Sequence, residues 1–133
     1  MTPEERKKFL EEHRLAVVGI PRRSAPPQLP PVYYVVDGDD LLISTTATRA
    51  KGKSVLHEPR VSVCVLGEAM PFPYLTVYGH GRIENERVVE TMMAVGAKMT
   101  GAPIPDSARP GIEDRAKKEQ RVVLRVTPES YYP

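Results

Sequence analysis

One stretch decides the fold of this chain: Val32-Tyr33-Tyr34-Val35-Val36-Asp37-Gly38-Asp39-Asp40-Leu41-Leu42-Ile43-Ser44-Thr45. Its first five residues are all β-branched or aromatic, which is typical of a strand. The next four, rich in aspartate and glycine, are typical of a turn, and the apolar residues that follow return as a second strand. The sequence therefore predicts an antiparallel hairpin over residues 32–45.

The segments on either side of this hairpin contain more strands than long helices. Further strands are predicted where apolar or alternating residues recur, at 15–20, 60–66, 74–84 and 121–126. Helices are predicted at about 3–13, where Thr2 and Pro3 form a typical start, and then at 48–57, 85–98 and 113–119. Gly79 and Gly81 interrupt the strand 74–84, as glycines do at bulges, bends or close backbone approaches.

Strands and long helices do not alternate regularly, which disfavours a doubly wound parallel sheet. We expect a mainly β fold, in which six antiparallel strands form a small barrel with helices packed outside it. Closing the barrel removes the strand edges that an open sheet would expose. We expect a single domain that spans residues 1–133, because nothing in the chain reads as a linker or an internal repeat.

Composition narrows the class of protein. A net charge of +2 in 133 residues, with the cations spread along the chain, does not indicate nucleic-acid binding. No apolar run approaches the roughly 20 residues that span a bilayer, and the charged N-terminus lacks the apolar core of a signal peptide. The single cysteine, Cys64, fits a reducing compartment. We therefore expect a cytoplasmic protein that binds neither membrane nor nucleic acid.

A phosphate site is predicted where the hairpin's second strand ends. Ser44, Thr45 and Thr46 supply hydroxyls, and Arg49, Lys51 and Lys53 follow at the start of the next predicted helix. Hydroxyls, backbone N–H groups and cations at such a junction suit a phosphate. The alternative is a solvated basic helix face.

The same residues fit a nucleotide-hydrolysing P-loop less well. Gly52-Lys53-Ser54 matches the end of that motif, but Ala47 stands where its first glycine belongs. The P-loop also belongs to a parallel sheet with crossover helices, which this chain does not predict.

Several segments, taken in order, resemble a known family. They are Pro27 to Val32, Leu41 to Thr45, Thr48-Arg49-Ala50-Lys51, Glu58 to Val63, Thr76 to Gly81 and Arg121 to Pro128. Together they resemble the flavin and deazaflavin oxidoreductases of the pyridoxamine phosphate oxidase-like split β-barrel, and most closely the small enzymes that use coenzyme F420. The resemblance covers roughly residues 5 to 132. It implies an FMN-binding split-barrel fold and a homodimer with each cofactor at the subunit interface.

The resemblance also implies roles for individual residues. Arg49 and Lys51 match the positions that hold the cofactor phosphate, and the hydroxyls of residues 44–46 complete that site. The segment that includes Gln28, Pro30 and Val32 matches the strand along the flavin-type ring. Tyr74 and Thr76 match a later strand that faces the cofactor from its other side. Lys53, with Arg22 and Arg23, could hold an acidic cofactor tail.

The expected activity is hydride transfer from reduced F420 to a small conjugated substrate, with no metal and no catalytic residue that the sequence identifies. An FMN enzyme on the same fold is one alternative, and a non-catalytic protein that binds a cofactor, haem or bilin is another. The chain lacks the arginine-rich substrate site and C-terminal motif of the enzymes that oxidise pyridoxamine phosphate. Among the histidines, we expect His80, which stands between two glycines, to lie nearest a pocket. Cys64 is predicted to be a packed or half-buried thiol.

Overall fold

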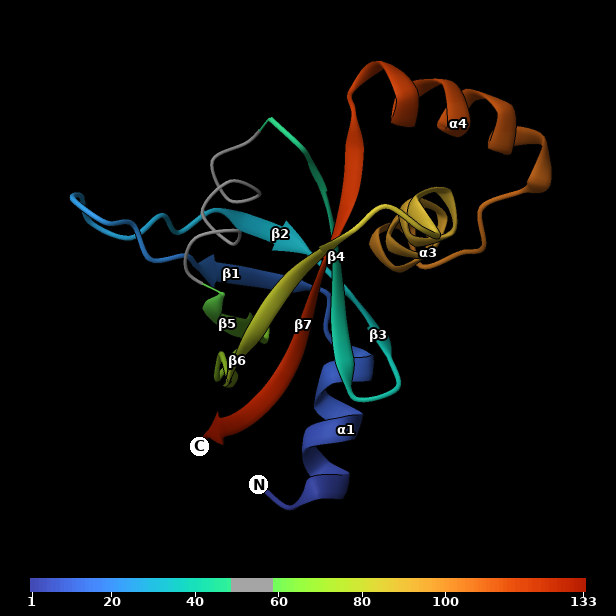
Figure 1. The fold of residues 1–133 in the computed structure, drawn as a ribbon. Coiled ribbons are helices and arrows are strands. Elements are labelled where there is room, and N and C mark those ends of the chain that lie inside the picture. The colour runs from blue at the N-terminus through green and yellow to red at the C-terminus, as the bar shows by residue number, and fades with distance from the viewer. Residues whose placement is uncertain (49–58) are drawn as a thin grey trace.

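The computed structural model describes residues 1–48 and 59–133 (Figure 1). The predicted helix at 48–57 therefore lies, apart from Thr48, outside the described residues. The same is true of the candidate residues Arg49, Lys51 and Lys53.

Seven antiparallel strands form one sheet, and the described helices lie outside it. The helices are α1 (Pro3–Glu12), α3 (Val88–Thr100) and α4 (Arg109–Lys118), with a short 3-10 turn, η1, at Asp106–Ala108. The strands are β1 (Leu15–Gly19), β2 (Pro31–Tyr33), β3 (Val35–Asp37), β4 (Asp40–Thr46), β5 (Arg60–Leu66), β6 (Tyr74–Glu84) and β7 (Arg121–Tyr132). Their order across the sheet is β2-β1-β5-β6-β7-β4-β3. The mainly β fold and the hairpin, which is formed by β3 and β4, are confirmed.

The sheet closes on itself through residues 31–37. The first and last strands of the sheet, β2 and β3, are consecutive in the chain and separated only by Tyr34. The first half of this segment pairs with β1 and the second half pairs with β4. The predicted single strand at 32–36 is therefore divided, and the six predicted strands become seven for this reason.

Tyr34 fixes the point of division. Its side chain is fully buried, and its hydroxyl donates a 2.6 Å hydrogen bond to the carbonyl of Leu10, at the end of α1. Its backbone N–H donates to the carbonyl of Arg14. The Lys98 ammonium lies 3.9 Å from the centre of the Tyr34 ring and donates to the same Leu10 carbonyl at 3.0 Å. Two helices are thus bound to the residue at which the sheet changes partners.

The core lies inside the barrel and follows the alternation of the strands. Side chains that point inward are buried along every long strand, and Phe9 and Leu10 of α1 cover one end. The fully buried members include Ile20, Leu41, Ile43, Val63, Val65, Leu75, Val77, Leu124 and Val126. Burial alternates from one residue to the next along these strands, with the same period of two that predicted strands from the sequence.

The longest pairing, between β6 and β7, contains an irregularity at Gly79. The register shifts between Tyr78 and Gly79, and a Cβ at Gly79 would overlap the carbonyl oxygen of Thr127. The predicted close backbone approach is confirmed at this glycine. Gly79 pairs with Pro128 and Tyr78 with Ser130, so Glu129 is the extra residue of a bulge.

Two predicted boundaries differ from the structure by four residues or more, and in both cases a proline explains the difference. The last strand was predicted to end at Val126, but β7 continues to Tyr132 because Pro128 lies at the bulge, where a proline is tolerated. The last helix was predicted to begin at Glu113, but α4 begins at Arg109. Pro110 lies in the first turn of α4. Backbone N–H groups there have no acceptor within the helix, so the N–H that proline lacks costs no hydrogen bond.

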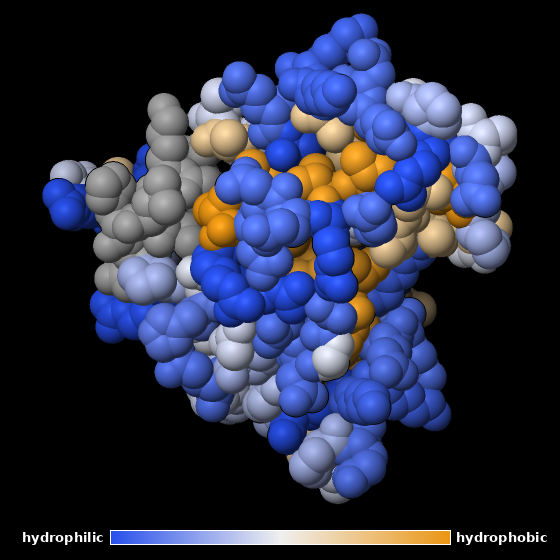
Figure 2. All heavy atoms as spheres, turned by 45° about the vertical axis from the view of Figure 1, so that its right-hand side comes forward, coloured by the Kyte–Doolittle hydropathy of each residue, from blue (hydrophilic) through white to orange (hydrophobic). Residues whose placement is uncertain are grey.

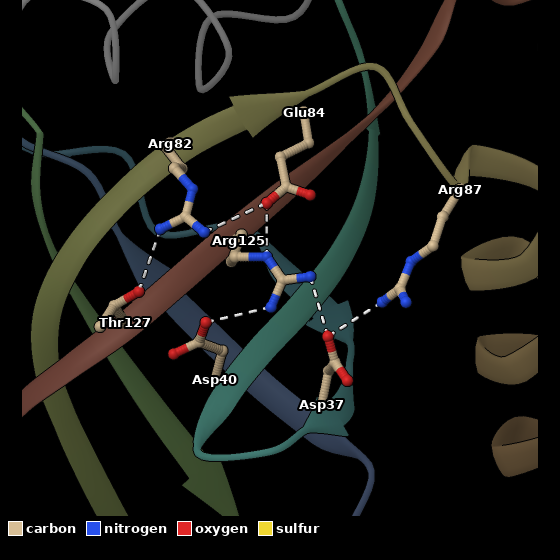
Figure 3. Close-up of polar contacts among 7 residues, drawn as sticks. All are labelled: Asp37, Asp40, Arg82, Glu84, Arg87, Arg125 and Thr127. Carbon is tan, nitrogen blue, oxygen red and sulfur yellow. Dashed lines mark hydrogen bonds and ion pairs between the residues drawn. The ribbon is translucent and has the colours of Figure 1, made fainter.

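A buried arginine joins four strands (Figure 3). Arg125 of β7, with a side chain only 11% exposed, donates to Asp37 at 2.8 Å, to Asp40 at 3.0 Å and to Glu84. Burial lowers the pKa of Arg125, but its hydrogen bonds to the three carboxylates outweigh this and raise the pKa overall. The hydrogen bond from Arg125 also holds the pKa of Asp37 below its ordinary value. The β3–β4 hairpin is thereby held against β6 and β7.

Replacing this arginine tests the cluster. We expect Arg125→Met to lower the free energy of unfolding at pH 7 by about 3–5 kcal/mol, because three carboxylates are left facing one another. Their mutual repulsion raises their pKa values in the folded variant, so the deficit should shrink as the pH falls toward about 4.5. Urea unfolding at both pH values measures this, with the exposed Arg23→Met as control. A deficit that is equal at both pH values would contradict the explanation.

Candidate functional site

A cavity of about 430 Å³ lies between the barrel wall and the pair of helices α3 and α4. The barrel side is formed by β2, Ser44 of β4 and Arg121 at the start of β7. Its described lining residues are Pro31, Val32, Tyr33, Ser44, Met92, Val95, Gly96, Met99, Thr100, Ile104, Ile112, Arg115 and Arg121. On the face of the molecule where these helices lie, Figure 2 shows apolar surface exposed among hydrophilic side chains. The volume falls in the range of small-molecule sites.

One end of this cavity is cationic. Among its described lining residues, only Arg115 and Arg121 are charged. Arg121 has a side chain 16% exposed, donates from Nε to Glu119 at 2.7 Å and reaches the Ser44 hydroxyl at 3.5 Å. Arg115 is more exposed and lies 3.6 Å from the same Glu119 carboxylate. The two guanidinium groups therefore share one carboxylate.

The end of β4 reaches this cationic end. Thr46 pairs with Arg121 across the β4–β7 ladder, and the N–H of Ala47 donates to the carbonyl of Gln120 at 2.9 Å. Arg49 follows Thr46 by three positions in the sequence. The last residue of β4 therefore lies beside Arg121, and the predicted phosphate-binding cations that follow it in the sequence lie outside the described part of the chain.

The three predicted hydroxyls do not point the same way. Ser44 faces the cavity, and Thr46 shares its face because side chains alternate along a strand. Thr45 points into the barrel and is fully buried. Its hydroxyl has no hydrogen-bond partner among the described residues. A buried hydroxyl without a hydrogen-bond partner costs free energy of folding, and Thr45 is such a hydroxyl at the end of β4.

The predicted ring-binding segment runs along the edge of β1. Val32 lines the cavity, the Pro30 carbonyl accepts from Val18 at 3.1 Å, and Gln28 exchanges two backbone hydrogen bonds with Ile20 at 3.0 Å. Because the backbone of this segment is held on both sides of Pro30, it presents its side chains in fixed directions. The structure brings Val32 and Ser44 together in one cavity.

Tyr74 and Thr76 lie elsewhere, on the outer face of the sheet. They pair with Leu66 and Cys64 of β5, so β1 and β5 separate them from β2. Three strand spacings amount to about 14 Å along the sheet. Within one protomer these two residues therefore do not meet the segment 28–32.

The outer face of the sheet is aromatic and exposed. Tyr74, Tyr78 and Tyr132 are all more than 40% exposed, and the half-buried Cys64 lies among them. His80 is also exposed there and contacts the carboxylate of Glu129. His80 does not line the cavity between the barrel and the helices α3 and α4, so this cavity is not the pocket near which the sequence placed His80.

Sequence reasoning missed most of the cavity. The sequence predicted helices at 85–98 and 113–119 but gave neither of them a role in a site, yet α3 and α4 both line the cavity. Ile104 and Ile112 are the one signal that was available, since they are isolated apolar residues in polar segments. The position of Arg121 could not be read from the sequence, because it depends on the pairing of β7 with β4.

Arg14 links the cavity rim to the loop between β5 and β6. It donates to both carboxylate oxygens of Glu68, at 3.1 and 3.2 Å, and to the carbonyl of Met99. The hydrogen bond from Arg14 holds the pKa of Glu68 below its ordinary value. The C-terminal end of α3 is thereby held in place over the cavity.

Lys98, which precedes the lining residue Met99 in α3, has a strongly perturbed pKa. Burial lowers the pKa of its ammonium to about 8. The ammonium is directed at the Tyr34 ring and the Leu10 carbonyl, and Lys98 does not line the cavity. We therefore assign it to the packing of α3 against α1 rather than to chemistry.

The described residues contain neither a membrane-spanning helix nor a cluster of metal-ligating side chains. No helix among residues 1–48 and 59–133 is long and apolar enough to span a membrane. In the same residues, no group of three histidine, cysteine, aspartate or glutamate side chains is placed to hold a metal ion.

Comparison with known proteins gives one match by sequence family. The family model described as pyridoxamine 5'-phosphate oxidase matches residues 2–133. No curated protein sequence matches the chain.

Solved structures share the fold across nearly the whole chain. A conserved hypothetical protein from Mycobacterium tuberculosis has a TM-score of 0.84 and 20% identity, covering 98% of this chain and 82% of its own. A protein named F420 reductase has a TM-score of 0.75 and 22% identity, covering 95% and 94%. The haem storage protein from Vibrio cholerae has a TM-score of 0.70 and 14% identity, covering 98% and 92%. At these identities the likeness concerns the fold.

The pH dependence of stability tests the role of Lys98. Between pH 8 and 10.5 the unfolded chain retains a proton on this lysine that the folded chain has lost, so stability should rise with pH across that window. Lys98→Met lacks this gain. Relative to Lys98→Met, the parent chain should become more stable by about 1–2 kcal/mol from one end of the window to the other, a value reduced for partial exposure. Urea unfolding measures the difference, which should stay constant for the exposed Lys8→Met.

Proposed function

Because the chain belongs to the pyridoxamine 5'-phosphate oxidase family, we propose that it is an oxidoreductase that uses the deazaflavin F420 to reduce a small conjugated substrate. The observation that carries the proposal is the cavity of about 430 Å³, with apolar walls and a cationic end beside Thr46, three positions before Arg49 in the sequence. The similarity of the fold to a protein named F420 reductase supports the choice of cofactor.

The residues at the end of β4 suit a phosphate-bearing cofactor. Arg49 and Lys51 would hold the phosphate by charge-assisted hydrogen bonds. Ser44 would add its hydroxyl, and Lys53 would extend the cationic surface toward an acidic tail. The buried Thr45 hydroxyl points into the barrel, so it would not contact a cofactor held on the face of Ser44.

The chain's own residues position the reactants and exclude water. Gln28 and the backbone around Pro30 would orient the ring, since their own hydrogen bonds to β1 hold this segment rigid. Met92, Val95 and Ile112 provide a dry wall, which strengthens electrostatic interactions within the site. When bound, reduced F420 supplies a hydride and a proton, so that it is oxidised by two electrons and the substrate is reduced by two.

We propose that two copies form the working enzyme. The outer sheet face has an aromatic surface that is exposed in one protomer, formed by Tyr74, Tyr78 and Tyr132, and Thr76 lies among these residues. Residues 74 and 76 lie too far from the segment 28–32 to share a ligand within one chain, whereas a second copy could bring them to it. A homodimer therefore reconciles the two groups of predicted cofactor residues.

The first experiment is a titration of the purified apoprotein with F420, FMN and haem, monitored by absorbance and fluorescence. Micromolar or tighter binding of F420 alone supports the proposal. A preference for FMN would assign the chain to the flavin enzymes of its family. Binding of haem without turnover of any electron donor would favour a non-catalytic carrier.

The phosphate site is tested by Lys51→Ala. We expect F420 binding to weaken tenfold or more, because a lost charged hydrogen bond costs on the order of 1.5–3 kcal/mol. Lys8→Ala, on the exposed face of α1, is the matched control and should bind as the parent chain does. Unchanged affinity in Lys51→Ala would remove this residue from the site.

The dimer is tested by Thr76→Arg, which introduces a charge in the middle of the outer sheet face. We expect this variant to sediment as a monomer and to lose cofactor affinity, because burying an unpaired charge at an interface is unfavourable. Ser107→Arg, in the exposed turn η1, should remain dimeric. A monomeric parent chain that binds F420 would refute the homodimer.

A further inference from the structure

We propose that the cavity between the barrel and α3–α4 binds the substrate that accepts the hydride, and that this acceptor is an apolar ring compound carrying an anionic group. Arg115 and Arg121 would recognise the anion. The term acceptor rests on the proposed function, whereas the class of ligand rests on the cavity alone.

The walls of the cavity indicate the apolar body of the ligand. Met92 and Val95 of α3 are buried, and Ile104 and Ile112 close the side formed by α4 and the segment before it. Thioether side chains adapt their shape to a ligand, and Met99 is 41% exposed, so it remains free to do so. A cavity of about 430 Å³ accommodates a compound of two or three fused rings.

The charges indicate an anion. Arg115 and Arg121 share the single carboxylate of Glu119, and no acidic residue is among the described residues that line the cavity. Arg121 is held in one orientation by Glu119 and Ser44, so its remaining donors are directed in advance of binding. A guanidinium group presents a planar pair of donors that matches a carboxylate or sulfonate. The low exposure of Arg121 strengthens such a contact.

Arg115 gives the cavity a cation that does not come from the barrel wall. It lies on α4, in the helical wall of the cavity, whereas Arg121 lies at the start of β7. Arg49 and Lys51, the proposed phosphate ligands, follow β4 in the sequence and lie outside the described residues. The proposed function assigns them to the cofactor, so Arg115 and Arg121 are left for the anion of the acceptor.

A matched pair of fluorescent probes tests the class of ligand in the full-length protein. Anilinonaphthalene sulfonate has an apolar ring system with one sulfonate, and phenylnaphthylamine has the same rings without it. We expect one sulfonate probe to bind per protomer, at least tenfold more tightly than the neutral probe, since the added contact is a charged hydrogen bond. Equal affinity of the two probes would overturn the proposal.

Three variants locate the binding. Arg115→Gln should reduce the preference for the sulfonate by about three- to tenfold and leave the neutral probe unaffected. Ile112→Trp, which fills the cavity, should weaken both probes at least tenfold. Lys117→Gln removes a charge from the same helix without touching the cavity lining, and should change neither. A preference unchanged in Arg115→Gln would refute the role of this arginine.

Competition with F420 distinguishes the two proposals. If F420 and the sulfonate probe bind together, the cavity is the acceptor's. If F420 displaces the probe, the cavity belongs to the cofactor and the inference is wrong. If F420 does not bind but the sulfonate preference persists and depends on Arg115, the class of ligand stands and the proposed function fails.

Discussion

Residues 31–37 pair with β1 through one half and with β4 through the other, and this double pairing closes the sheet on which the cavity is built. It brings the two edges of the sheet together at a single buried residue, Tyr34. The side chain of Tyr34 is held by α1 and approached by Lys98 of α3. A strand that changes partners at one residue is possible only if that residue is fixed, because a shift by one position would exchange the two faces of the segment.

The cavity is a consequence of this closure. Its barrel wall combines β2, the first strand of the sheet, with Ser44 of β4, the last strand but one, and these two strands would lie far apart if the sheet were open. The helices α3 and α4 then cover the line where the edges meet. A ligand site at the seam of a barrel therefore needs no special insertion, since closure and the covering helices create both of its walls.

Two arginines on β7 have different roles. Arg121 and Arg125 lie on the same face of the strand, because their separation of four positions preserves the alternation. Arg125 is surrounded by three carboxylates, so its charge is fully compensated and it joins strands. Arg121 shares one carboxylate with Arg115, so positive charge remains at the cavity. The number of acidic partners, rather than the burial alone, separates a structural arginine from one available to a ligand.

The sequence by itself determined the mainly β class, the hairpin at its centre, the close backbone approach at Gly79 and the family. Each of these depends on local chemistry: β-branched residues, a turn of aspartate and glycine, a missing side chain, and an ordered set of short motifs. Only the tertiary structure decided that Tyr34 divides a strand, that β7 continues past Pro128, and that Arg115 and Arg121 meet Ser44 beside an apolar cavity. These features join residues as much as 77 positions apart, from Ser44 to Arg121. Periodicity along the chain carries no information about such pairs, because their contact is set by the register between strands.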